Sequence, residues 1–286
     1  MQDHPLRARA AILGAAILFS TGGAAIKATH LTGWQVASFR SGVAALAVLL
    51  MLPAARRGFN GLAAAVAAGY AATMILFVLA NKLTTAASTI FLQATAPIYL
   101  VLLGPLLLKE PIRGRDVPFM AALAAGLALF FVGHDATSAI APDPVAGKVL
   151  AALSGVCWAF AVTGLRFMSK HGAAGGGGAA AVVLGNVFAF AVCLPFALPV
   201  TSVGVADFGI VAFLGVFQIG LAYVLLNYGL HHVGALEASL LLLAEPVLNP
   251  LWAWLVHGER PTPWALAGGA VIVAATLAHT LTAREA

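Results

Sequence analysis

The chain has 286 residues, of which 62% are hydrophobic and 9% are charged, and its mean hydropathy is +0.99. A water-soluble fold would expose far more apolar area than a polar surface could mask, which excludes soluble enzymes and disordered chains. The formal net charge of +5 does not indicate nucleic-acid binding, because the basic residues lie in short joints between apolar runs and form no stripe interleaved with aromatics.

Ten apolar runs follow one another along the chain, and each is close to the roughly 20 residues that a helix needs to cross a bilayer. The first run has the length of a true span, so it is predicted to be a transmembrane helix and not a cleavable signal peptide. The joints are short, which predicts antiparallel neighbours. The predicted spans are residues 8–28, 33–53, 61–80, 85–108, 115–133, 146–167, 179–199, 207–229, 235–256 and 262–281.

The basic residues are unequally divided between the two sides of these spans. Ten lysines and arginines fall on the side of the termini, and four, at Lys27, Lys82, Lys148 and Arg260, fall on the other. Because cytoplasmic loops carry the excess of positive charge, both termini are predicted to lie in the cytoplasm. An even number of spans also requires the termini to share a side.

A spacing of proline and glutamate occurs twice in the chain. Pro97 lies 13 residues before Glu110, and Pro246 lies 13 residues before Glu259. Internal repeats constrain architecture more strongly than local propensities do. The spacing therefore predicts a duplicated unit, in which each proline loosens its helix and acts as a hinge.

An asparagine in the preceding span extends the match between the halves. Asn81 precedes the proline of its half by 16 residues, and Asn227 precedes its own by 19. The predicted fold is an all-α integral membrane protein of ten transmembrane helices, with one five-helix repeat over residues 1–138 and a second over 139–286. Because five is odd, the second repeat must be inverted, as in many secondary transporters, whose substrate sites lie at the repeat interface near mid-membrane.

The duplicated motifs are Ala96-Pro97 through Lys109-Glu110 and Glu245-Pro246 through Gly258-Glu259, accompanied by a Phe39-Arg40 pair in the second span. Together they resemble the drug/metabolite transporter superfamily, specifically its EamA family of five-plus-five carriers. Within that family the sequence is most similar to the aromatic amino-acid exporter group. The resemblance implies an exporter of amino acids and related small metabolites in the bacterial inner membrane.

Glu245 is the most conspicuous candidate for a functional residue. It lies about ten residues into the ninth span, roughly 15 Å from either rim at 1.5 Å per residue. An intramembrane carboxylate marks a substrate, ion or proton path by default, so Glu245 could pair with an ammonium or cycle a proton. The alternative is a structural glutamate beside the break at Pro246. Asn249 and Trp252 share its helix face.

Other polar and aromatic side chains lie at similar depth. In the fourth span, Ser88, Thr95 and Tyr99 share one face, whereas Gln93 is expected to point elsewhere. Aromatic faces and amides suit a zwitterion with an apolar side chain, although interhelical hydrogen bonding and ordinary packing would also explain them. The predicted substrate-binding residues are Asn81, Tyr99, Trp158, Gln218, Tyr223, Asn227, Glu245 and Asn249.

Three charged residues are interpreted as structural. Arg40 could bind a substrate carboxylate, but the resembled family has arginine there across unrelated substrates, which favours a tie to backbone carbonyls or an acidic partner. Glu110 and Glu259 sit at opposite rims and are expected to cap loops or to pair with nearby arginines.

The sequence has no phosphate-binding glycine loop, no metal-ligand spacing and no nucleophile–base arrangement, so neither an enzyme activity nor a cofactor is expected. The predicted function is the export of aromatic and other neutral amino acids by alternating access. One alternative is a lipophilic-cation exporter that uses Glu245 as the charge partner, and another is a non-transporting scaffold. The expected partners are a small-molecule substrate and the lipid bilayer, and the expected state is a monomer or a weak homodimer.

Overall fold

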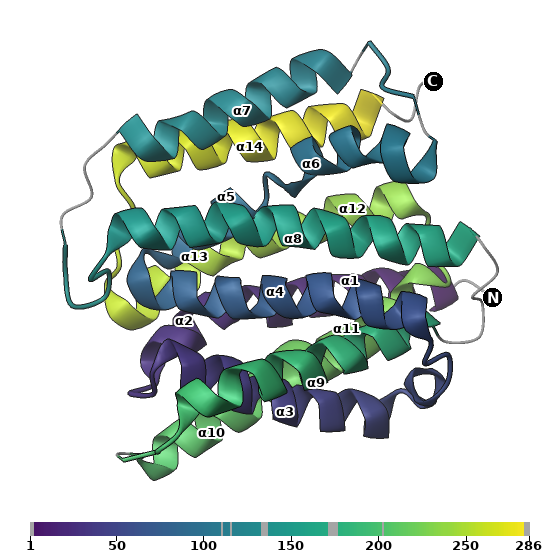
Figure 1. Ribbon diagram of the computed structural model, residues 1–286. Helices are drawn as coiled ribbons and strands as arrows, with labels where there is room; N and C mark the ends of the chain where they lie inside the picture. The colour runs from purple at the N-terminus through teal and green to yellow at the C-terminus, as the bar shows by residue number, and fades with distance from the viewer. Residues whose placement is uncertain are drawn as a thin grey trace.

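The computed structural model describes residues 3–109, 111–114, 116–132, 137–170, 177–201 and 203–282. All regular elements of this part of the chain are helices, arranged as a bundle of roughly antiparallel spans (Figure 1). Nine spans are long and apolar enough to cross a membrane, and a shorter apolar helix, α7 (Asp116–Val132), occupies the fifth predicted span. The predicted all-α membrane fold is therefore confirmed.

The first half of the chain contains both continuous spans and spans that are divided into more than one helix. Besides α7, four spans make up this half. They are α1 (Asp3–Ser20) with α2 (Gly22–Ala28), then α3 (Gly33–Met51) followed by the short η1 (Pro53–Arg56), then α4 (Gly61–Leu83), and then α5 (Ala86–Gln93) with α6 (Ala96–Leu103) and the π-helical η2 (Gly104–Leu108).

The second half also contains continuous and divided spans, and the ninth span is divided like the fourth. This half consists of α8 (Pro144–Lys170), α9 (Gly177–Ala197), α10 (Val205–Phe213) with the π-helical η3 (Leu214–Leu221) and α11 (Ala222–Leu230), α12 (Ala235–Leu242) with α13 (Ala244–His257), and α14 (Pro263–Thr282).

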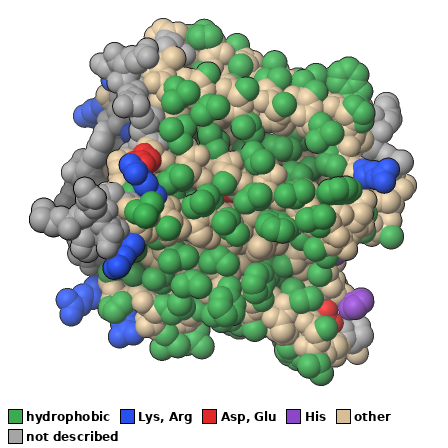
Figure 2. Space-filling view, turned by 180° about the vertical axis from the view of Figure 1, so that it is seen from behind, with side chains coloured by type: hydrophobic (Ala, Val, Ile, Leu, Met, Phe, Trp, Pro, Cys, Tyr) green, Lys and Arg blue, Asp and Glu red, His purple; other side chains and the backbone are tan. Residues whose placement is uncertain are grey.

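The two ends of the bundle are distinguishable. Both termini lie at the same end (Figure 1), which we call the near end, and the opposite end, where α2 and α13 finish and α5 begins, is the far end. Most of the lysine and arginine side chains in Figure 2 gather at the near end, on the left, beside a broad hydrophobic surface across the middle of this face. This distribution agrees with the unequal count of basic residues in the joints.

The spans that contain Pro97 and Pro246 are both interrupted just before these prolines. The fourth span breaks at Ala94 and Thr95, ahead of Pro97, and the ninth breaks at Leu243, ahead of Pro246. Proline lacks a backbone N–H and crowds the preceding turn, which accounts for helix breaks at these places. The helical stretches that follow also end alike, in the left-handed conformation, at Lys109 (φ 54°) and Gly258 (φ 65°).

The most extensive contacts between spans have counterparts in which every span is replaced by its equivalent in the other half of the chain. The third span packs on the sixth (α4 on α8), and the eighth packs correspondingly on the first (α11 on α1). The second and seventh spans (α3 and α9) pack on each other, as do the fifth and tenth (α7 and α14). This exchange supports the division into two repeats.

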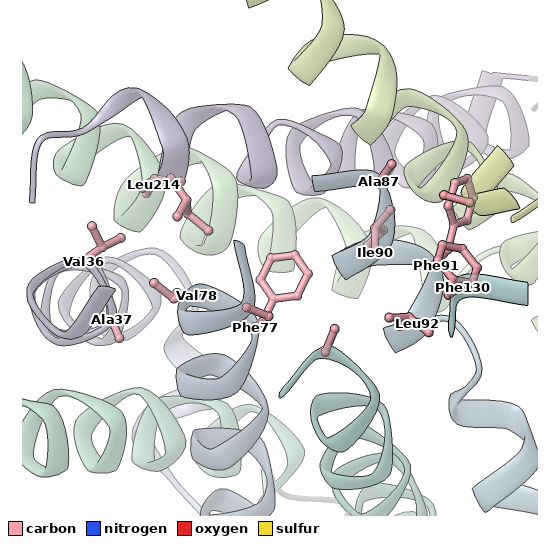
Figure 3. Close-up of a cluster of buried hydrophobic side chains, with 14 of the residues drawn as sticks. Val36, Ala37, Phe77, Val78, Ala87, Ile90, Phe91, Leu92, Phe130 and Leu214 are labelled. Carbon is pink, nitrogen blue, oxygen red and sulfur yellow. The ribbon is translucent and has the colours of Figure 1, made fainter. Parts of the chain in front are cut away.

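A cluster of buried hydrophobic side chains lies between the middle of the bundle and the far end. It joins α3, α4, α5, α7 and η3, among other elements, with Phe77 and Val78 of α4, Ile90 of α5 and Leu214 of η3 close together in Figure 3. The close approach of α7 and α14 depends on glycine: a Cβ at Gly268 would lie 2.6 Å from the carbonyl oxygen of Gly126. The far half of the bundle is therefore densely packed.

Candidate functional site

A cavity of about 570 Å³ lies between the two halves of the bundle, within the range of about 300–1,000 Å³ that is typical of small-molecule sites. Its lining begins at the near end, with Leu52, Gly178 and Leu230, and continues to the middle of the bundle, where Gln93 and Glu245 lie. No lining residue comes from the last helical turn at the far end. The cavity therefore opens toward the near end and is closed in the other direction.

Aromatic rings form one wall of the cavity. The ring of Tyr70 lies 6.4 Å from that of Trp158 and 6.1 Å from that of Tyr223, between centroids, and Phe19 meets Tyr223 edge-on at 5.4 Å. Tyr70 is held in place because its ring packs against Gly185 of α9, where a Cβ would approach to 2.5 Å. The wall offers flat apolar surfaces to an aliphatic or aromatic side chain.

Polar side chains from four spans interrupt this apolar lining. Arg40 comes from α3, Gln93 from the end of α5, Gln218 from η3, Asn227 from α11 and Glu245 from α13. Gln218 lies in a π-helical segment, a feature that occurs frequently at functional sites. The combination of apolar walls with a few polar groups is that of a site for a small polar molecule with an apolar side chain.

Two of these polar groups have buried atoms that make no hydrogen bond to any described residue. They are the Nε of Arg40 and the Oε1 of Gln218. Gln218 makes one long contact, from Nε2 to the carbonyl oxygen of Phe19 at 3.4 Å. Buried polar groups are normally satisfied, so unpartnered groups on a cavity wall indicate where a ligand or water binds.

The structure brings five of the eight predicted substrate-binding residues to the cavity. Trp158, Gln218, Tyr223, Asn227 and Glu245 line it. They come from the sixth, eighth and ninth spans, which meet on this wall.

The other three predicted residues, Asn81, Tyr99 and Asn249, lie outside the cavity lining. The side chain of Asn81 is buried and donates to the carbonyl oxygen of Phe77 at 2.9 Å, leaving its Oδ1 without a partner. Tyr99 is half-buried on α6. Asn249 is buried with neither side-chain atom hydrogen-bonded.

The shared helix face of Glu245, Asn249 and Trp252 is divided between two environments. Glu245 lines the cavity, whereas Asn249 packs against the first span, its Oδ1 lying 2.6 Å from where a Cβ of Gly23 would be. Trp252 donates from Nε1 to the Oγ of Ser20 at 2.9 Å. The far-end part of this face of α13, with Asn249 and Trp252, therefore packs against α1 and α2 and does not line the cavity.

Three lining residues with polar side-chain groups, Arg40, Tyr70 and Gln93, were not among the predicted substrate-binding residues, and Arg40 was interpreted as structural. Gln93 was expected to point away from the Ser88–Thr95–Tyr99 face. Gln93 lines the cavity and those three residues do not, so the cavity lies on the Gln93 side of α5. The break at Ala94 and Thr95 interrupts the helical phase between Ser88 and Tyr99. Tyr70 carried no sequence signal, because a single tyrosine in an apolar span is ordinary packing.

A buried ion pair closes the far end. The Nζ of Lys27 lies 3.5 Å from the Oε2 of Glu259, and both side chains are almost inaccessible. Lys27 also donates to the carbonyl oxygens of Thr84 at 2.7 Å and Ile140 at 2.6 Å, while Glu259 accepts from the N–H of Ala86 at 2.7 Å. These contacts join the first, fourth and ninth spans, together with the joint between the fifth and sixth.

Glu259 lies at the far end and accepts from the N–H of Ala86 at the start of α5, in agreement with the capping alternative. The pairing with an arginine is wrong, because the residue is buried and its cationic partner is a lysine. The short joint after α13 turns Glu259 inward toward the start of α5, where its Oε1 accepts a hydrogen bond from the backbone N–H of Ala86. Glu110, its counterpart in the first half, lies outside the described residues.

Further polar contacts surround this pair at the far end. Lys82 donates to the backbone oxygen of Thr29 at 2.8 Å, and Asp207 accepts from the N–H of His30 at 2.8 Å. His257 contacts the carbonyl oxygen of Ala24 at 2.8 Å. We call this set of contacts, centred on Lys27 and Glu259, the far-end closure.

The fold and the cavity define a multi-pass membrane protein with a central site that is accessible from one end. Residues 145–281, from α8 into α14, match the EamA-like transporter family. The match covers most of the second half of the chain. Among the described residues, no group of three histidine, cysteine, aspartate or glutamate side chains is placed to hold a metal ion.

Curated relatives have low identity to the chain. It is 28% identical over 207 residues to the uncharacterized transporter YdfC of Bacillus subtilis, covering 72% of this chain and 66% of that protein. It is 25% identical over 189 residues to the threonine/homoserine exporter RhtA of Escherichia coli, covering 64% of this chain and 61% of RhtA. A probable terminal-alkyne amino-acid exporter of Streptantibioticus cattleyicolor is 34% identical over 122 residues, covering 42% of this chain and 40% of the relative.

A solved crystal structure shares the fold. It superposes with a TM-score of 0.65 over 97% of this chain and 98% of the other, at 19% sequence identity. The likeness extends over both halves of the chain, so the arrangement of all the spans is one that occurs in another protein.

Proposed function

We propose that the chain is a secondary carrier of the bacterial inner membrane that exports aromatic and other neutral amino acids, and related small metabolites, by alternating access. The observation on which the proposal depends is the asymmetry of the central cavity, which reaches the near end and is sealed at the far end by buried polar contacts. A carrier caught with one side open has this form.

The near end is assigned to the cytoplasm. Basic residues are concentrated there, as the charge rule for cytoplasmic loops requires. In this state the cavity would receive substrate from the cytoplasm, which is the direction of loading for an exporter. Two relatives are named as exporters of amino acids, and their names support both the direction and the substrate class.

The second conformation would open the far end, by rocking of two inverted five-helix repeats at residues 1–138 and 139–286, with Pro97 and Pro246 as hinges. Asn81 and Asn249 suit such a change. Both are buried with unpartnered polar atoms, and each lies closer to the far end than the cavity-lining residues of its own helix. Opening of the far-end closure would give these amides access to water or to substrate.

The test is exchange in proteoliposomes. Purified protein should exchange labelled phenylalanine or threonine for unlabelled amino acid, whereas protein-free liposomes should not. Failure with all twenty amino acids would remove the substrate class. A complete absence of flux for amino acids and organic cations alike would instead favour a non-transporting scaffold.

Thiol labelling tests the state of the cavity separately from its substrate. The native thiols, Cys157 and Cys193, are free and should first be replaced by serine and alanine. In this background Val162→Cys, on the cavity wall, should react with a polar thiol reagent, and Ala87→Cys, buried at the far end, should not. Reaction of both at equal rates would contradict a closed far end.

A second candidate function is the export of lipophilic cations. The observation in its favour is a carboxylate, Glu245, in a cavity walled by Tyr70, Trp158 and Tyr223, because aromatic faces and an acid both attract cations. Glu245→Gln should abolish binding of a quaternary ammonium compound if this function is correct. Retention of amino-acid exchange by the same variant would favour the amino-acid function.

A further inference from the structure

We propose that Arg40 binds the carboxylate of the transported amino acid and is a substrate-binding residue, not a structural link between helices. The assignment rests on the proposed amino-acid function and adds to it the group that selects for the acid. The argument has three steps: the position of Arg40, the lack of a counter-ion, and the chemistry of the groups that share its cavity.

Arg40 is buried deep in the bundle. Its exposed fraction is 1%, and it is the eighth residue of α3, roughly 10 Å from the far end of that helix at 1.5 Å per residue. Its side chain nevertheless borders the central cavity. The guanidinium is therefore out of reach of bulk lipid and of the rims but within reach of a molecule in the cavity.

The guanidinium has no counter-ion in the described part of the chain. No aspartate or glutamate oxygen of the described residues lies within 4.0 Å of it. Its closest protein contacts are long ones from Nη2, at 3.4 Å to the carbonyl oxygen of Met74 and 3.5 Å to the Met74 sulfur, and Nε has no partner. An arginine stays charged and offers five donors in a fixed fork, so most of its binding capacity is unused.

The buried lysine at the far end gives the contrast. Lys27 is buried to a similar degree, but it has Glu259 as a counter-ion and two carbonyl oxygens as acceptors. A buried charge without such partners is costly, which makes an uncompensated arginine poor as a mere structural tie. An anionic group of a ligand would supply the missing partner, and a carboxylate fits the guanidinium fork with two parallel hydrogen bonds.

The rest of the cavity complements the other end of an α-amino acid. The unpartnered Oε1 of Gln218 and the carboxyl group of Glu245 are acceptors for an ammonium, and the hydroxyl of Tyr70 can add a donor for the carboxylate. The rings of Trp158 and Tyr223 face the space that remains for the side chain. A zwitterion thus satisfies the unpartnered groups together, whereas a simple cation leaves Arg40 uncompensated.

The experiment measures ligand-induced thermal stabilisation of the purified full-length protein, because a ligand that binds the folded form raises its apparent stability. L-phenylalanine and L-threonine are compared with their carboxamides, which keep the ammonium and the side chain but lack the carboxylate. The variants are Arg40→Lys, Arg40→Gln and, as a control, Arg56→Lys, whose guanidinium bonds backbone oxygens in the exposed joint at the near end.

Wild-type protein and the Arg56 variant should bind the amino acids and discriminate against the amides. Both Arg40 variants should bind the amino acids about 10- to 100-fold more weakly, the range for loss of a charged hydrogen-bonding partner. They should bind the amides as wild-type protein does. The melting temperature without ligand reports whether each variant is folded.

Two results would overturn the assignment: wild-type affinity for the amino acids in a folded Arg40 variant, or equal affinity of wild-type protein for acid and amide. The second comparison needs no variant, so it decides the matter even if the Arg40 variants do not fold. If no amino acid stabilises the wild-type protein, the proposed function fails and this assignment fails with it. If amino acids bind but Arg40 makes no difference, only the assignment fails.

Discussion

The far-end closure and the central cavity differ in whether a buried cation has a counter-ion. At the far end, Lys27 pairs with Glu259 and both residues bond backbone groups around them, although the Oε2 of Glu259 makes no hydrogen bond. In the cavity, Arg40 is equally buried, but no carboxylate oxygen of the described residues lies within 4.0 Å of it. Burial alone therefore does not distinguish a structural polar group from a binding one. What separates Lys27 from Arg40 is that the described part of the protein supplies a counter-ion to the first and none to the second.

The comparison also explains how one bundle can be closed at one end and open at the other. Buried polar groups cost free energy unless they are paired, so contacts among Lys27, Glu259 and the start of α5 stabilise the closed arrangement only while they are all present. They link separate spans, and opening the far end would require them to separate together.

The largest predicted effect is that of removing Lys27. In Lys27→Met, Glu259 would remain buried without its counter-ion, and the expected loss of stability is about 3–5 kcal/mol. Thermal or denaturant unfolding in detergent would measure it.

Two further variants control this experiment. Lys82→Met removes a lysine whose acceptors are the neutral oxygens of Thr29, so it should cost only about 1 kcal/mol. The double variant Lys27→Met/Glu259→Gln should recover part of the loss, because no buried charge is left alone. Equal losses of stability in Lys27→Met and Lys82→Met would show that the ion pair with Glu259 contributes no more than hydrogen bonds to neutral oxygens.

A smaller effect is expected from filling a glycine site at the far end. A Cβ at Gly147 would lie 2.7 Å from the backbone nitrogen of Thr84, an atom that cannot rotate away. Gly147→Ala should therefore cost about 1–3 kcal/mol through overpacking, as measured by the same unfolding experiments.

The matched variant is Gly178→Ala, on the cavity wall at the near end. Its Cβ would meet only Leu165 at an ordinary 3.5 Å, so the substitution should be neutral or stabilising by up to about 1 kcal/mol from helix propensity. A destabilised Gly178→Ala, or a neutral Gly147→Ala, would contradict the difference in packing between the two ends.

The spans were predictable because each is an uninterrupted apolar run between short polar joints, and hydrophobicity alone defines such runs. The duplicated prolines likewise predicted two similar breaks, at Ala94–Thr95 and at Leu243. What the sequence could not supply was which face of a helix borders the cavity. Gln93 and Ser88 lie on different faces of α5, and only the packing of α5 against its neighbours places Gln93 on the cavity wall.

Contacts between distant residues were also beyond the sequence. Lys27 and Glu259 lie at opposite ends of the chain and looked like two ordinary rim charges, because their pairing depends on how the first and ninth spans pack. Arg40 could be placed at the right depth from its position in the second span. That Arg40 has no counter-ion among the described residues could be learned only from the positions of its neighbours in the fold. This property is the one that indicates a binding role.

The smallest predicted effect compares two helix caps of similar chemistry. Thr85 caps α5 at the far end by accepting from the N–H of Ser88, and Asn60 caps α4 at the near end by accepting from the N–H of Ala63. Removal of such a cap costs about 0.5–2 kcal/mol. Thr85→Ala should fall near the upper limit, because Ser88 is fully buried and would lose both its cap and the hydroxyl contact at 2.8 Å.

Asn60→Ala should fall near the lower limit, because Asn60 is exposed and water can replace the lost acceptor. Unfolding of the two variants under identical detergent conditions would measure the difference. Equal losses would mean that the far end is as accessible to water as the near end. That result would contradict the closed state directly, because a hydrated far end could replace each lost protein contact with one to solvent.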